Sequence, residues 1–168
     1  GSLPSGLTLN TSTGAITGSV SAVGSDTTST FTIRVTDGTT NVDRQFKITV
    51  KPPVRTTYNS PATFAVPSGV SAVDVLVVAG GGGAGGFGGG GAGGLIYRPG
   101  FPVSPGGTVT VTVGNGGTAP SPGSADNPAP NPGQDSVFGT LTAKGGGAAG
   151  SNAAQAANGG SGGGTGQA

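Results

Sequence analysis

Two segments in the first third of the chain alternate apolar and polar side chains with a period of two. They are residues 30–37 and 41–50, and the pair Asp37-Gly38 stands at their junction. Alternation of this kind is typical of strands that bury one face, and an aspartate followed by glycine favours a tight β-hairpin turn. We therefore predict a hairpin whose buried face carries Phe31, Ile33, Val35, Phe46, Ile48 and Val50.

Shorter apolar segments extend the β pattern along the chain. Residues 7–9 and 15–17 are separated by turn formers and predict a small hairpin. Five later segments are expected to form a small antiparallel sandwich: residues 62–66, 71–79, 95–98, 108–113 and 136–143. In the fourth of these, three valines share one face opposite threonines, at Val109, Val111 and Val113. The pattern as a whole predicts an all-β protein.

A break in the β pattern divides the chain. Lys51-Pro52-Pro53 ends the first block, because proline cannot continue a strand ladder. We predict a β module of two packed sheets over residues 1–51, a linker over 52–61 and a glycine-rich β domain over 62–168. Glycine- and proline-rich inserts are expected to emerge from the ends of the sandwich of the second domain.

The insert 80–94 is glycine at every position except Ala84, Phe87 and Ala92. A helix is excluded, because each glycine costs about 1 kcal/mol relative to alanine. Two interpretations stay open, a flexible linker and ordered packing of polyglycine-II-type segments with three residues per turn. On a threefold register Ala84 and Phe87 fall in one row with Gly81, Gly90 and Gly93.

Two further inserts differ in character. Residues 120–132 form a proline-rich polar loop, which is expected to be exposed as either a spacer or a recognition tip. Residues 145–168 mix glycine, alanine, asparagine and serine, and either a further extended glycine segment or disorder fits them. Phe87 and residues 120–132 are the preferred mutagenesis targets, while individual receptor-binding residues are unknown from the sequence.

The amino-acid composition argues against several classes of function. The chain has 38 glycines and 13 prolines, only 8% charged residues and a net charge of +1. A nucleic-acid-binding protein would show a basic stripe, so nucleic acid is not an expected partner. Cysteine and histidine are absent, which excludes disulfides and histidine-based catalytic or zinc sites. No apolar stretch approaches the length of a membrane span, so membrane insertion is not expected either.

Candidate chemistry is sparse. Gly80, Gly82 and Gly85 follow an apolar strand and match the dinucleotide fingerprint G-x-G-x-x-G. The fingerprint needs a helix after the loop and an acidic residue about 20 positions later, and neither is present here. Nucleotide binding is therefore not expected, because any polyglycine tract satisfies the pattern.

The remaining candidates have structural interpretations as well. Asp37, Asn41 and Asp43 crowd one turn with oxygen ligands of the kind calcium prefers, but their spacing fits no EF-hand and hairpin solvation is favoured. Asp135 is interpreted as a turn residue before a strand. Four aromatic residues could stack on sugars or belong to a core or an interface: Tyr58, Tyr97, Phe87 and Phe101. We assign no catalytic, cofactor-binding or metal residue, and we do not expect an enzyme.

The first block resembles a known module. LPSGLTLNTSTGAITG at residues 3–18, followed by TFTIRVTDG and FKITV, is similar to the immunoglobulin-type, cadherin-like repeat of bacterial and phage surface proteins. The proline-glycine turn and the T-G-x-I-x-G hairpin are signature elements of that repeat. Its members carry further β structure before LPSGL, so the resemblance implies an Ig-like sandwich that is incomplete at its N-terminus. Either a longer protein was cut, or another chain completes the open edge.

The second block resembles glycine-rich domains in tail-fibre and other structural proteins of phages, especially marine and cyanobacterial ones. The shared elements are TFAVPSGVSAVDVLVVAGGGGAGG, GGLIYR, GGTVTVTVGNGG and SVFGTLTAKGGG, which span most of residues 62–147. Glycine tracts of such proteins usually continue further, which implies a second truncation at the C-terminus.

These resemblances imply a structural protein of a virion appendage of the tail-fibre type. The expected role is host-surface attachment or fibre assembly, with a location at the virion surface. Expected partners are further copies of the chain, plausibly in a trimer, other virion proteins, and a glycan or protein of the host surface. A capsid decoration protein and a bacterial surface adhesin or filament subunit are the alternatives, the latter extracellular or on the cell surface. Ice binding by glycine helices is a remote fourth.

Overall fold

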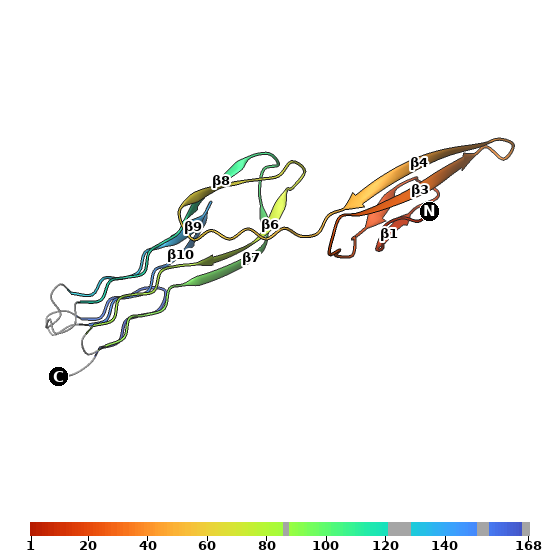
Figure 1. The fold of residues 1–168 in the computed structure, drawn as a ribbon. Coiled ribbons are helices and arrows are strands. Elements are labelled where there is room, and N and C mark those ends of the chain that lie inside the picture. The colour runs from red at the N-terminus through yellow and green to blue at the C-terminus, as the bar shows by residue number, and fades with distance from the viewer. Residues whose placement is uncertain (86–87, 121–128, 151–154, 166–168) are drawn as a thin grey trace. The chain divides into compact units, whose positions relative to one another are not determined.

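The computed structural model describes residues 1–85, 88–120, 129–150 and 155–165 (Figure 1). The chain divides into two compact units, Gly1–Thr56 and Thr57–Ala168. The division falls within residues 52–61, where the sequence predicts a linker. Every regular element in the described ranges is a β-strand, so the predicted all-β class is confirmed. Among the same residues, no helix has the length and apolar character that crossing a membrane requires.

The first unit begins with the predicted small hairpin. Strands β1 (Leu7–Leu9) and β2 (Ile16–Gly18) pair antiparallel. The side-chain oxygen of Asn10 accepts hydrogen bonds from the N–H groups of Ser12 and Thr13, both at 3.0 Å. An asparagine that bonds to the backbone two and three residues ahead fixes a turn, which explains why the chain reverses here.

A longer hairpin follows, formed by β3 (Thr27–Thr36) and β4 (Asn41–Val50), which pair over their full ten residues. Phe31 faces Phe46 across the ladder, with ring centroids 6.0 Å apart. The hairpin is confirmed, but its apolar face is only partly buried. Phe31 is 5% exposed, whereas Val35 and its partner Val42 are 67% and 64% exposed. A two-stranded ribbon has too few neighbours to bury a face of this length.

The second unit contains two antiparallel sheets. One has the strand order β10-β9-β8-β5 and the other pairs β6 with β7. The bounds are β5 (Ala62–Ala65), β6 (Ala72–Val78), β7 (Leu95–Pro102), β8 (Thr108–Thr112), β9 (Ser136–Phe138) and β10 (Leu141–Ala143).

Two predicted strand boundaries in this unit are wrong. Residues 136–143 form two strands, because Gly139, with φ at +56°, turns the chain between them. Strand β7 continues four residues beyond its predicted end at Arg98. Its continuation passes through a register shift opposite Val73–Val75, where the Asp74 carboxylate accepts a hydrogen bond from the N–H of Gly100 at 2.8 Å. A bulge of this kind lets proline and glycine lie within a paired strand.

The core of the second unit lies between the two sheets. Four residues of this core are each less than 9% exposed: Val75 and Val77 on β6, Ala79 just after β6, and Ala143 on β10. Phe138 packs against this cluster. Its ring also lies 5.7 Å from Phe101 of β7 and 5.9 Å from Phe64 of β5, so one aromatic side chain links both sheets. The predicted inward face of the valines on β8 is confirmed, since Val111 is 7% exposed.

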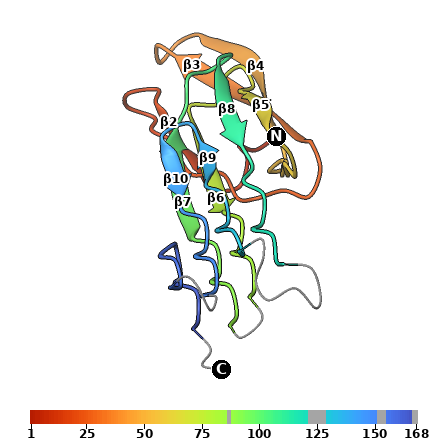
Figure 2. The same ribbon diagram turned by 90° about the vertical axis from the view of Figure 1, so that its left-hand side faces the viewer.

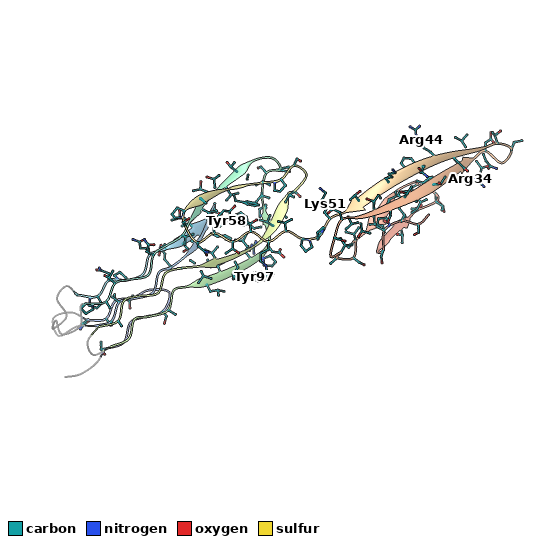
Figure 3. All side chains as sticks on the ribbon, viewed as in Figure 1. Arg34, Arg44, Lys51, Tyr58 and Tyr97 are labelled. Atoms are coloured by element: carbon teal, nitrogen blue, oxygen red, sulfur yellow. The ribbon has the colours of Figure 1, made fainter. Side chains whose placement is uncertain are left out.

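The strands of this unit lead directly into extended glycine-rich segments (Figure 2). Figure 3 shows many side chains on the sheets and very few on these segments. The sheets thus form a conventional core at one end, and the segments that leave them must be held by something other than side-chain burial.

Candidate functional site

Six extended segments lie side by side beyond the sheets of the second unit and form what we call the glycine bundle (Figure 1). Each of the first five has one end next to a strand or one residue from it, so the sheets fix the position of that end. In chain order segments I to VI are residues 79–85, 88–94, 114–118, 131–134, 144–150 and 160–164.

Hydrogen bonds between segments recur every third residue. Segment I donates to segment II from Ala79, Gly82 and Gly85, at 2.8 to 2.9 Å. It donates to segment IV from Gly80 and Gly83, at 3.1 and 2.9 Å. Three residues per turn without internal hydrogen bonds is the geometry of the polyproline-II helix. For the described residues 80–85 and 88–94 the interpretation as a flexible linker is therefore wrong, and ordered polyglycine-type packing is what the structure has.

The pairing pattern defines the layout of the bundle. Segment I bonds to segments II, III, IV and V, and segment V bonds to segments I, II, IV and VI. The nine bonded pairs fit two staggered rows, III–I–II and IV–V–VI. The backbone N–H and C=O groups of each inner segment are thus used by several neighbours, which satisfies polar groups that would otherwise be buried unpaired.

Most glycines of the bundle leave no room for a side chain, because the backbones touch. A Cβ atom at Gly82 would overlap the carbonyl oxygen of Gly147, and one at Gly146 would overlap the carbonyl oxygen of Gly91. Gly81 is different, since the nearest atom to its Cβ would be the Gly91 carbonyl oxygen at 3.6 Å. In segment I, residues 81 and 84 of the predicted row both face outward. The row does not continue through Gly90, because the chain reverses between segments I and II.

Segment V is the centre of the bundle. Residues 145–150 are all buried, although they are only glycine and alanine. Ala148 accepts a hydrogen bond at 3.0 Å from Ala157, which lies on the return between segments V and VI. Of the two interpretations of residues 145–168, an extended glycine segment holds for the described residues of segments V and VI. The bundle therefore has a core made almost wholly of backbone.

An ion pair joins the first residue of segment V to the residue just before β9. Lys144 Nζ lies 2.6 Å from Asp135 Oδ2, and the N–H of Gly145 donates to Asp135 Oδ1 at 2.9 Å. The Lys144 ammonium, and then the Gly145 N–H, hold the pKa of Asp135 below its ordinary value. The sequence analysis missed this contact. Recognising the Gly139 turn would have revealed it, because pairing Ser136 with Ala143 brings residues 135 and 144 together.

Asp135→Asn is expected to lower the urea midpoint of the second unit at pH 7. A depressed carboxyl pKa contributes stability that is present above the unfolded pKa near 3.8 and is lost as pH falls through the folded pKa. The midpoints of wild type and variant should therefore converge at strongly acid pH. Asp26→Asn, in the other unit, serves as a control. A difference in midpoint that persists unchanged in acid would contradict the assignment.

The glycines of the dinucleotide fingerprint have other partners. The N–H groups of Gly80, Gly82 and Gly85 all donate to backbone carbonyls of neighbouring segments. A phosphate-binding loop needs such groups free and aimed at the ligand. The local structure agrees with the expectation that this motif is a chance match in a polyglycine tract.

The three oxygen-bearing residues of the β3–β4 turn do not form a common site. Asp37 Oδ1 accepts hydrogen bonds from the N–H groups of Thr39 and Thr40, which lower the pKa of Asp37. Asp43 forms a two-point ion pair with Arg34 at 2.7 and 2.8 Å, and this pair lowers the pKa of Asp43. No cluster of metal-ligating acids occurs within the described residues.

The aromatic candidates separate into different environments. Phe101 belongs to the core, whereas Tyr97 on β7 is 61% exposed and Tyr58 is half-buried (Figure 3). Phe87 lies outside the described residues, as do residues 121–128 of the proline-rich loop. At the described C-terminal end of that loop Ala129, Asn131 and Pro132 are exposed as predicted, whereas Pro130 is buried. The backbone of Asn131 also bonds into the bundle.

The fold and the bundle define a class of protein in which a β-sandwich carries a packed array of glycine segments. The family described as Glycine-rich domain matches residues 56–168, two thirds of the chain, and the chain belongs to this family. The family described as Putative Ig domain matches residues 1–51, in line with the resemblance of the first block. No curated protein and no solved structure matches the chain.

Proposed function

We propose that the chain is a structural protein of a virion appendage of the tail-fibre type, serving host-surface attachment or fibre assembly. The observation that carries this proposal is the glycine bundle. It is an elongated array held by backbone hydrogen bonds, and its backbone groups are consumed in packing rather than left for chemistry. Such an array is suited to mechanical support and to holding a binding surface at its end.

The topology of the bundle supports a presenting role. The chain leaves segments I, III and V at Gly85, Thr118 and Gly150, at the end of the bundle away from the sheets (Figure 1). Contacts with a partner would be made at this end, because binding residues often lie at the end of a rigid scaffold. Attachment would then be multivalent, with repeated weak contacts giving avidity. The partners would be virion proteins and a glycan or protein of the host surface.

A structure of the assembled particle that contains this chain tests the proposal. We expect the chain on a tail appendage, with the bundle intact and its far end directed outward. Finding the chain on a capsid lattice would show a decoration protein instead. Finding a bacterial surface filament assembled by strand exchange would show a filament subunit. Either of these two outcomes overturns the attachment role.

A further inference from the structure

The outer face of the β6–β7 sheet carries large apolar side chains in solvent. Leu76 faces Tyr97 across the ladder and Val78 faces Leu95, and all four are 54% to 63% exposed. Inward-facing Val77, between Leu76 and Val78, is 6% exposed. An antiparallel sheet with one solvated face normally shows polar residues on that face. A contiguous apolar patch in this position marks an interaction surface.

Exposed positions of the glycine bundle continue the apolar patch. Along β6 and segment I the outward-facing residues are Val78, Gly81 and Ala84, which are three residues apart. Along β7 and segment II they are Leu95, Ala92 and Gly89. All four bundle positions are exposed, and none carries more than a methyl group. Together they form a continuous uncharged surface, which we call the smooth face, made of two cross-strand pairs and two rows of glycine and alanine.

Charge lies beside the smooth face rather than on it. The nearest charged residues in the sequence of these strands are Asp74 and Arg98, towards the end of the sheet away from the bundle. From Leu76 to Ala84 and from Gly88 to Tyr97 the sequence has no charged residue. The opposite sheet differs, because its exposed face is lined by threonines such as Thr108, Thr110 and Thr112. Only one of the two outer faces is therefore apolar.

We propose that the smooth face binds the smooth face of a second copy of this chain around a twofold axis. An exposed apolar surface without charge is suited to contact another uncharged apolar surface, and a second copy of the chain supplies one. The four apolar side chains are 54% to 63% exposed, and a patch of this kind typically covers roughly a few hundred Å². The adjoining rows, each about 20 Å long at 3.1 Å per residue, raise this area towards the roughly 800 Å² per partner of a standard interface. The inference does not depend on the attachment role.

Sedimentation velocity of the full chain tests the pairing. We expect a dimer to form as the protein concentration rises to about 100 µM. Leu76→Lys should weaken the dimer by at least about tenfold, because it places two ammonium groups in an apolar contact. Tyr97→Ser should weaken it as well, by removing an aromatic contact. Both side chains are already exposed, so thermal unfolding of the variants should match wild type.

Thr110→Lys, on the exposed face of the other sheet, is the matched control and should leave dimerisation unchanged. A wild-type protein that stays monomeric over this range overturns the proposal, and so does a trimer. Equal weakening by Leu76→Lys and Thr110→Lys would also overturn it, because association would then not use the smooth face.

Discussion

Gly82→Ala is expected to destabilise the second unit by about 3 kcal/mol and to lower its melting temperature by roughly 10–20 °C. The added methyl group would occupy the position of the Gly147 carbonyl oxygen, with Gly146 beside it. These are backbone atoms of the central segment, so no side chain can rotate away to relieve the overlap. Differential scanning calorimetry of the full chain measures the shift.

The neighbouring substitution Gly81→Ala is the matched control. It changes the same residue type in the same segment and has the same effect on the unfolded chain, but its Cβ has room. We expect no loss, or a gain of up to about 1 kcal/mol from reduced freedom of the unfolded chain. Equal effects of the two substitutions would show that segment I does not pack against segment V, and the bundle would then be wrong.

Phe138→Ala is expected to have the second large effect, a loss of about 3 kcal/mol. Phe138 contacts Phe101 from one sheet and Phe64 from the other, so its removal leaves a cavity where the sheets meet. Segment IV ends one residue from β9 and segment V starts next to β10, so we expect the bundle to unfold together with the sheets. Urea unfolding followed by tyrosine fluorescence measures the change.

Phe138→Leu keeps most of the volume and should cost less than about 1.5 kcal/mol. If the alanine and leucine variants lose the same stability, ring contacts rather than filled volume would govern this site. If neither variant loses stability, the two sheets would not depend on each other.

The strands were predictable because their signal is local. The alternation of valines and threonines around Val111 shows which face is buried, and Asp37-Gly38 shows where the chain turns. The predicted single strand at residues 136–143 failed because the β propensity on both sides of Gly139 concealed a turn. The unequal burial of Val35 and Phe31 was not predictable, since it depends on what covers each end of the β3–β4 ribbon.

The glycine bundle was predictable only as one of two alternatives. Glycine has no side chain that could select one neighbour over another. The sequence of residues 80–94 therefore does not indicate which carbonyl groups accept hydrogen bonds from their N–H groups. The pairing of the strands determines which segments become neighbours. The ion pair between Asp135 and Lys144 was hidden for a related reason, because it exists only once β9 and β10 pair.

The threefold repeat of the bundle restricts how its length can change. Deleting one residue from a segment rotates every following residue by about 120°, which turns a close backbone contact outward and a free position inward. Insertions of three residues preserve the facing of every row and lengthen a segment by about 9 Å. Matched insertions of three in paired segments would extend the bundle without any new hydrophobic residue. Its reach can therefore be adjusted in whole turns while the sheets at its base stay unchanged.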